Sequence, residues 1–474
     1  MSSQANTNMV MIGWAVGDIT PVEPVLVSGQ FHARISEKVL DPITATALAI
    51  GHGNSNKQAI LLSCDLLWID GLVLNSVREA LGKRITDFDP KHLIINATHT
   101  HNGPETVDNM YPPAPEGVMS PAEYRECLIE TLAEIATQAW NTREPGGFSR
   151  AFNYAVVGHN RRPTYSGGWS AMYGSVNRDD FVGLEGFEDH GLDMLFTWDA
   201  DSNLTGIIIN LACPSQVSEA LSVISADFWH ETRLAMKEAF GENLFILPQV
   251  SAAGDMSPHP IVHKTRETDM LSRMGLSLRE AIARRITRAV IEVFDVVQKD
   301  ISTHAEIAHT VKELNLPFRK LTAAEIAESQ AEIERLTKEL PASPEGITGD
   351  GTLSAKWVSR EWHSGILERA KLQEQGATFK IEFNVFRLGD IAFCTNPFEL
   401  YLDFGLAIKA RSYAFQTFLI QLACGRGGWG GYLPTAKAES KGSYGAIPGS
   451  CSISADGGWL LVKETLAILK NMWK

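Results

Sequence analysis

The strongest constraint on the fold is a set of short apolar segments that run directly into polar or small, reactive residues. Four segments have the length and composition of buried β-strands: 59–63 (AILLS), 92–97 (HLIINA), 205–212 (TGIIINLA) and 244–250 (LFILPQV). Helical patterns separate some of them, which is typical of an α/β domain. The sequence therefore predicts an α/β fold of mixed sheets with flanking helices.

Several further segments carry clear signals for secondary structure. Residues 120–123 (SPAE) form a capping box with proline at the first helical position, which predicts the start of an amphipathic helix. The periodicity predicts one long helix over 265–297 and another over 322–340. The turn-rich segment 341–357 predicts a loop and a candidate lid hinge. Residues 379–400 predict a β-hairpin.

Composition excludes several classes of partner and compartment. The formal charge of -14 over 474 residues argues against a nucleic-acid or anionic-membrane surface. No apolar run approaches the length of a membrane span, and the N-terminus lacks the pattern of a signal peptide. The six cysteines have no CxxC spacing, which suits free thiols in a reducing compartment. We therefore expect a cytoplasmic protein with a small-molecule substrate and no integral membrane contact; a homo-oligomer remains open.

The predicted buried strands share a chemical feature at their ends. Segment 92–97 leads to His99 and His101, 205–212 leads to Cys213, and 244–250 leads to SAAGDMSPH. A further strand at 390–395 leads to NPFE. Ligands in α/β sheets bind beyond the carboxyl ends of strands, so we expect these four ends to line one pocket.

The pair His99 and His101 is the first candidate for chemistry. In extended backbone, residues two apart point to the same side, so both rings would face the same site. Two histidines with a thiol and a carboxylate are ligand types that zinc accepts. The alternative is that both histidines are hydrogen-bonded polar residues at the end of a strand.

The segment 251–260 (SAAGDMSPHP) places Asp255 and Ser257 just beyond a predicted strand. A turn of small residues allows backbone N–H groups to approach a substrate oxygen, and it presents Ser257 as a possible nucleophile. A plain strand-to-helix turn explains the same residues. The residue pattern leaves both interpretations open.

Taken together, these segments resemble the N-terminal catalytic domain of the neutral, non-lysosomal ceramidases and their bacterial relatives. The matching motifs follow the family's order along nearly the whole chain: GWAVGDITP, DPITATALAI, LLSCDLLWI, NATHTHNGPE, NRRP, SADF, SAAGDMSP, FRLGDIAFCTNPFEL and GYLPT. The resemblance implies a neutral-ceramidase-like fold, and one catalytic domain over 1–474 with a helical insertion at about 315–375. The C-terminal β domain of secreted members is not expected.

The resemblance also implies a zinc ion and assigns residues to it. His99 would be the first ligand, Glu399 the acidic ligand, and Tyr432 the tyrosine ligand, with Tyr444 as the weaker choice. His101 and Arg161 would contact the substrate's carbonyl or oxyanion, and Ser257 would be the catalytic serine. The roles of His230 and His259 stay open.

One position departs from the family pattern. Relatives carry a histidine, usually a zinc ligand, where this chain has Cys213 in NLACPSQVS. A thiolate is a good zinc ligand, so the sequence predicts that Cys213 binds zinc directly. The alternatives are a buried neutral thiol, or a nucleophile with His101 as its base.

The leading hypothesis is a zinc-dependent hydrolase that cleaves an amide bond in a small soluble substrate. A second hypothesis keeps the pocket but changes the chemistry to that of an isomerase or lyase, with or without metal. The third is a non-catalytic binding protein, in which Cys213 would be a relic of decay.

Overall fold

The computed structural model describes residues 8–52, 57–425 and 431–474. Its larger sheets are mixed, as the sequence predicts. The first has the order β5-β4-β3-β1-β6, the second β14-β12-β11-β7 and the third β16-β17-β18-β20. Their strands are β1 (Val10–Asp18), β3 (Thr44–His52), β4 (Gln58–Cys64), β5 (Leu93–Ala97), β6 (Glu144–Pro145), β7 (Gly147–Tyr154), β11 (Gly191–Trp198), β12 (Leu204–Leu211), β14 (Phe245–Val250), β16 (Ile307–Pro317), β17 (Thr378–Leu388), β18 (Ile391–Thr395) and β20 (Gln416–Ile420).

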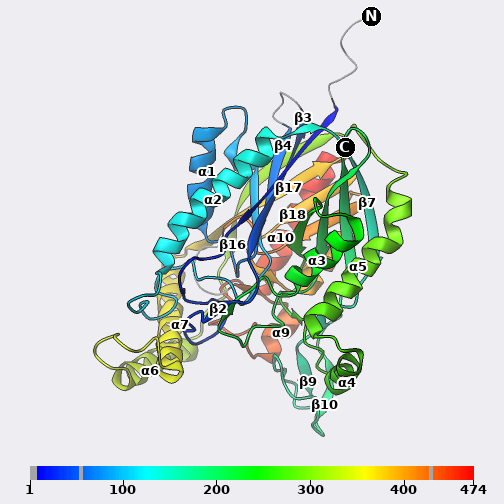
Figure 1. Ribbon diagram of the computed structural model, residues 1–474. Coiled ribbons are helices and arrows are strands. Elements are labelled where there is room, and N and C mark those ends of the chain that lie inside the picture. The colour runs from blue at the N-terminus through cyan, green and yellow to red at the C-terminus, as the bar shows by residue number, and fades with distance from the viewer. Residues whose placement is uncertain (1–7, 53–56, 426–430) are drawn as a thin grey trace, which may run out of the picture.

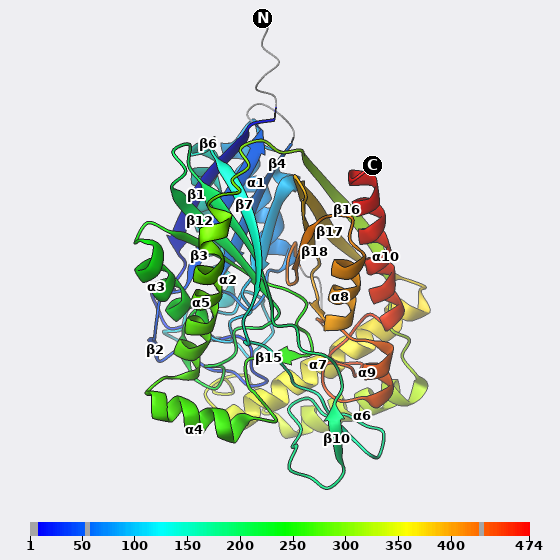
Figure 2. The same cartoon turned by 90° about the vertical axis from the view of Figure 1, so that its right-hand side faces the viewer.

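Helices cover the outer faces of these sheets, and the inner faces pack against one another (Figures 1 and 2). Helices α1 (Gly71–Arg84) and α2 (Pro121–Asn141) lie on the first sheet, while α3 (Phe228–Phe240) packs on α5 (Leu278–Val297), which covers the second. Helices α8 (Leu402–Arg411) and α10 (Ala455–Met472) cover the third. The fold class predicted from the sequence is confirmed.

The remaining elements lie around the lower end of the sheets in Figure 1. They are the helices α4 (Lys264–Met274), α6 (Ala323–Glu339), α7 (Gly351–Glu374) and α9 (Ala436–Lys441), with the strand pairs β2 (Lys38–Val39) and β13 (Val223–Ile224), β8 (His159–Asn160) and β15 (Met256–Ser257), β9 (Pro163–Tyr165) and β10 (Phe181–Leu184), and β19 (Glu399–Leu400) and β21 (Tyr432–Leu433). The exception is the short η1 (Pro90–His92), which lies at the opposite end of the first sheet, where β5 begins. Helices α6 and α7 follow β16 and precede β17 in the chain.

Two predicted boundaries are wrong for identifiable reasons. The expected helix over 265–297 is divided into α4 and α5, because Gly275 ends α4 in the left-handed conformation and Ser277 with Glu280 forms a new capping box. The predicted loop 341–357 ends early, because the Asp350 side chain caps α7 and residues from Gly351 onward are helical. The capping box at 120–123 and the hairpin between β17 and β18 are confirmed.

Parallel strand pairs bring the carboxyl ends of strands to one region. β4 pairs in parallel with β5, β12 with β14, and β18 with β20. Backbone hydrogen bonds then link the segments that follow: Ala97 N–H donates to Leu422, Ser251 N–H to Leu211, and Gln421 N–H to Val250. The segments that follow the strands of the three sheets are therefore hydrogen-bonded to one another in one region.

All six cysteines are free thiols. Within the described part of the chain, no helix has both the length and the apolar character needed to cross a bilayer.

Candidate active site

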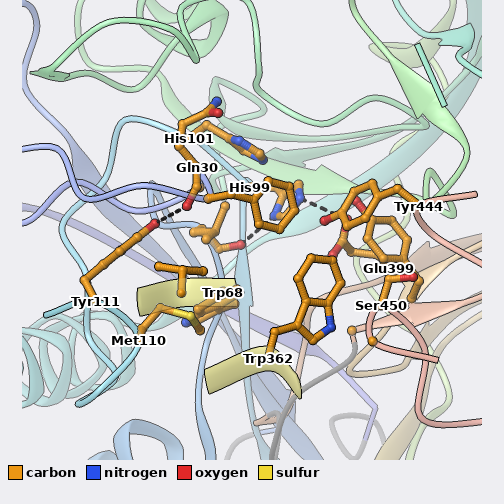
Figure 3. Close-up of a pocket in the computed structure, with 17 residues that line it drawn as sticks. Gln30, Trp68, His99, His101, Met110, Tyr111, Trp362, Glu399, Tyr444 and Ser450 are labelled. Carbon is orange, nitrogen blue, oxygen red and sulfur yellow. Dashed lines mark hydrogen bonds and ion pairs between the residues drawn. The ribbon is translucent and has the colours of Figure 1, made fainter. Parts of the chain in front are cut away.

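A pocket with a cavity volume of about 110 Å³ lies at the ends of these strands (Figure 3). His99, His101, Glu399 and Tyr432 line it, and so does Tyr444. The rest of its wall is largely apolar and aromatic, with Phe31, Leu67, Trp68, Met110, Tyr111, Val358 and Trp362. The pocket thus combines a small polar group with an apolar chamber, which is typical of small-molecule sites.

His99 reaches the pocket from a strained turn after β5. Its φ of 61° lies in the left-handed region, which non-glycine residues adopt infrequently. The expectation that extended backbone places both rings on the same side is therefore wrong at His99. The rings of His99 and His101 still meet, with centroids 5.0 Å apart and planes at 90°.

The hydrogen bonds of His99 define its tautomer. Nδ1 lies 2.7 Å from the Leu67 carbonyl, which only accepts, so Nδ1 carries the hydrogen. Nε2 faces Glu399 Oε2 at 3.3 Å, which is an ion-pair contact when Nε2 also carries a proton. Without that proton, the Nε2 lone pair and the carboxylate can both bind a cation.

Glu399 and Tyr432 face the site together because of strand register. They are direct partners in the parallel pair of β19 and β21, so their side chains lie on the same side. Burial alone would raise the pKa of Glu399, but the charges of His99 and Arg161 hold it below its ordinary value. Burial raises the pKa of Tyr432 well above its ordinary value, against the opposing effect of Arg161.

Arg161 lies fully buried beside these two residues. Its Nη2 donates to the Tyr432 hydroxyl at 3.1 Å and to the Gly254 carbonyl at 2.9 Å, and lies 3.9 Å from Glu399 Oε2. Its Nη1 donates to the Tyr173 hydroxyl at 2.9 Å. Burial opposes the positive charge, but Tyr173, Tyr432 and Glu399 keep the pKa above its ordinary value. A permanent cation is thus fixed next to the pocket.

His101 is held as a neutral ring. Gln216 accepts from Arg161 through Oε1, so its Nε2 donates to His101 Nε2 at 2.6 Å. His101 Nδ1 then carries the hydrogen and lies 3.4 Å from Glu219 Oε2. Burial, followed by the charges of His99 and two arginines, lowers the pKa of His101 well below its ordinary value. Gly29 packs against this ring: a Cβ there would lie 2.6 Å from His101 Cγ.

Ser257 lies one hydrogen bond behind this network. It is completely buried, and its hydroxyl is 3.2 Å from the Tyr173 hydroxyl and accepts from the His259 N–H at 3.2 Å. It is not among the residues that line the pocket. Tyr173 and Gln216 connect Ser257 to Arg161 and His101. The sequence gives no signal for Tyr173, and for Gln216 only its position after a predicted strand.

Cys213 lies apart from the polar group that lines the pocket. Its sulfur contacts the Pro214 carbonyl at 3.4 Å, and the side chain belongs to an apolar cluster with Phe228 and Trp229. Burial, with a smaller contribution from Asp227, raises the pKa of this thiol well above its ordinary value, against the opposing effect of Arg161. Among the described residues, no three or more His, Cys, Asp or Glu side chains form a group with metal-site geometry. Tyr432, the strand partner of Glu399, lines the same pocket as His99 and Glu399.

His230 and His259 differ in their relation to this site. His230 lies in the first turn of α3 and is not among the residues that line the pocket. His259 Nε2 lies 2.9 Å from the Gln216 carbonyl and 3.6 Å from Glu219 Oε1, so it belongs to the outer part of the network.

Comparison with known proteins identifies the fold. No family model matches this chain, and no curated protein matches by sequence. The structure of neutral ceramidase from Pseudomonas aeruginosa superimposes with a TM-score of 0.69 at 15% identity, covering 98% of this chain and 75% of that one. A ceramidase complexed with C2 gives a TM-score of 0.68 at 15% identity, covering 98% of this chain and 76% of that one. The chain therefore has the fold of these ceramidases, as its motifs predict.

Proposed function

We propose that this protein, which shares the neutral-ceramidase fold, is a zinc-dependent hydrolase of an amide bond. The observation that carries the proposal is His99 Nε2 facing the Glu399 carboxylate at 3.3 Å, at the end of an apolar pocket that Tyr432 also lines. The structural neighbours are named ceramidases, and ceramide is an amide. This supports C–N hydrolysis over isomerisation or elimination in the same pocket.

The residues at the site fit zinc. Imidazole nitrogen and carboxylate oxygen are ligands that zinc prefers, and a catalytic site needs three protein ligands with one open position. His99, Glu399 and Tyr432 would supply them. Zinc at such a site would polarise a carbonyl and lower the pKa of water to about 7. The high pKa of Tyr432 means that its phenol would have to lose a proton on binding.

The chain's own residues have roles in the hydrolysis that follow from their contacts. The oxygen of water joins the carbonyl carbon, the C–N bond breaks, and the amine nitrogen takes a proton. The Arg161 guanidinium would stabilise the negative charge that develops on the carbonyl oxygen. His101, neutral because of its low pKa, would accept a proton once Gln216 releases its Nε2. The aromatic wall would exclude bulk water.

Metal analysis with a hydrolysis assay tests the proposal. We expect stoichiometric zinc in protein purified without chelator. We also expect release of free amine from a panel of N-acyl amides, loss of that activity with a chelator, and recovery with added zinc. Protein that carries no metal and hydrolyses no member of the panel at any zinc concentration would refute the proposal.

Ser257 is expected to position Arg161 rather than to act as the nucleophile. Its hydroxyl contacts Tyr173, which in turn accepts from Arg161. Ser257→Ala should lower kcat/KM by about tenfold, the effect of one lost hydrogen bond of about 1 kcal/mol plus some misorientation of Arg161. A nucleophilic serine would instead cost on the order of 10⁴-fold or more and abolish any acyl-enzyme. Rapid-quench mass spectrometry distinguishes the two results.

Cys213 is the predicted fourth ligand, and its contribution needs its own test. The raised pKa and the apolar packing support a neutral thiol, so we expect Cys213→Ser to retain stoichiometric metal. Cobalt-substituted protein should then show no thiolate-to-cobalt charge-transfer band. If that band is present in the parent protein and absent in Cys213→Ser, and Cys213→Ser loses metal that Cys213→His keeps, the thiolate ligand predicted from the sequence is correct instead.

A further inference from the structure

A second cavity adjoins the candidate active-site pocket. It has a volume of about 300 Å³ and lies between α7 and the start of β17. Two residues, Trp362 and Gly449, line both this cavity and the active-site pocket. The side chain of Trp362 and the backbone at Gly449 therefore form a partition between the two spaces.

Contacts on several sides hold the Trp362 indole in this partition. The ring of Phe31 stacks on it with centroids 5.2 Å apart and planes at 3°, and Tyr444 meets it edge-on at 5.9 Å. Gly449 lies so close that a Cβ there would be 2.0 Å from Trp362 Nε1. The close fit against a residue without a side chain closes the gap between the cavities. Figure 3 shows Trp362 projecting beside Tyr444 and Ser450.

The active-site pocket is small for an amide substrate with a long chain. An apolar cavity of about 150 Å³ accommodates benzene, and this pocket has only about 110 Å³. With the carbonyl group beside His99 and Arg161, the remaining space suits an acyl chain of a few carbons. Its walls, from Leu67, Trp68, Met110 and Val358, are apolar, as such a chain requires.

The cavity beyond the partition is suited to more of the same chain. Phe318, Ile366, Leu372 and Phe379 supply apolar surface. Its charged residues Glu368 and Lys380 lie at the exposed rim. The buried Arg369 donates through Nη1 to the carbonyls of Pro448 and Cys451, while its Nε and Nη2 have no hydrogen-bond partner among the described residues. Opening the partition would thus extend the pocket along the apolar side of this cavity.

We propose that Trp362 sets the maximum length of the acyl chain, so that this protein acts on short-chain N-acyl amides. This inference rests on the proposed amide hydrolysis. Trp362 is a specificity-determining residue: its indole separates an acyl chain in the active-site pocket from the second cavity. Removing the indole joins the two cavities and admits longer chains.

Binding of the product carboxylates tests the length limit without turnover. The probes are acetate, butanoate, hexanoate, octanoate and decanoate, measured by calorimetry with the full chain as purified. In the parent protein we expect affinity to rise to butanoate and then to stop rising or fall. In Trp362→Ala it should continue to rise by about fourfold for each methylene, the equivalent of about 0.8 kcal/mol. Hexanoate should therefore gain on the order of tenfold over the parent protein.

Two further variants separate an opened partition from a loosened helix. Trp357→Ala removes an indole from the same helix at a residue that lines neither cavity, and it should leave the length profile unchanged. Adding Ile366→Trp to Trp362→Ala places an indole on the buried wall of the second cavity and should restore the preference for short chains. A Trp357→Ala profile that extends like that of Trp362→Ala would overturn the proposal.

Hydrolysis of the matching N-acyl anilides separates failure of the length limit from failure of the proposed function. If the carboxylates bind as expected but no anilide is cleaved, the amide hydrolysis fails and the length limit stands. If anilides are cleaved with the same chain-length profile in the parent and Trp362→Ala proteins, the length limit is wrong. It is also overturned if the parent protein binds decanoate more tightly than butanoate.

Discussion

His99→Ala is expected to remove both the bound zinc and the hydrolytic activity. The variant deletes the imidazole that faces Glu399 Oε2 at 3.3 Å and leaves a carboxylate with Tyr432 as the remaining donors. Because a catalytic metal stabilises the transition state by several kcal/mol and each 1.36 kcal/mol is tenfold, kcat/KM should fall by about 10³-fold or more. Mass spectrometry of the metal content and kcat/KM for the best N-acyl amide measure the two effects.

Two variants accompany this measurement. Glu399→Gln keeps the size of the side chain but removes its charge, and it should also lower the zinc content. His263→Ala removes an exposed imidazole at the start of α4 and should change neither zinc nor activity. His99→Ala protein with full metal and full activity would show that the reaction does not depend on this histidine.

Arg162→Met is expected to lower the free energy of unfolding more than the other variants proposed for this protein. Arg162 is completely buried, unlike most arginines, and donates to the Glu185 carboxylate at 3.0 Å and to the carbonyls of Tyr444 and Gly442 at 2.8 Å. Removing one member of a buried ion pair leaves the other charge without compensation, which costs about 3–5 kcal/mol. The midpoint of urea unfolding, at an unchanged m-value, measures the loss.

A double variant identifies the cause of that loss. Arg162→Met with Glu185→Met removes both charges and should recover part of the stability, because an apolar pair of similar volume packs without stranded charge. Arg178→Met breaks an exposed pair with Asp180 and should shift the midpoint much less. If the double variant is as unstable as the single one, the bonds to Gly442 and Tyr444, and not the ion pair, determine the effect.

The adjacent residues Arg161 and Arg162 have different roles that their shared motif does not predict. Both lie in NRRP, and the resemblance assigns a substrate contact to Arg161 alone. In the structure, Arg161 lies beside Glu399 and Tyr432, while Arg162 bonds the backbone of the segment that carries Tyr444. The second arginine therefore supports the pocket wall from behind, and no feature of the local sequence distinguishes the two.

The predicted strands and most helix starts depend on local patterns, and these appear in the structure. Strands β4, β5, β12 and β14 are apolar runs buried along nearly their whole length, and the capping box at Ser120 forms as expected. The long helix expected over 265–297 failed at Gly275, where a left-handed cap interrupts a periodicity that continues on both sides. Gly275 and the Ser277–Glu280 capping box signal this break in the sequence, but the continuous hydrophobic periodicity on both sides predicts one unbroken helix.

By itself the sequence determined the fold class, because apolar periodicity is a local property. Of the four strand ends expected to line one pocket, those that lead to His99 and His101 and to Glu399 line it, whereas Cys213 and Ser257 do not. Tertiary structure alone decided how the site residues meet. The register of β19 with β21 sets Glu399 beside Tyr432, and the left-handed turn at His99 brings its ring to Glu399. Cys213 packs in an apolar cluster and is not among the residues that line the pocket. Trp362 reaches the pocket from a helix far along the chain, a contact that only packing between distant segments creates.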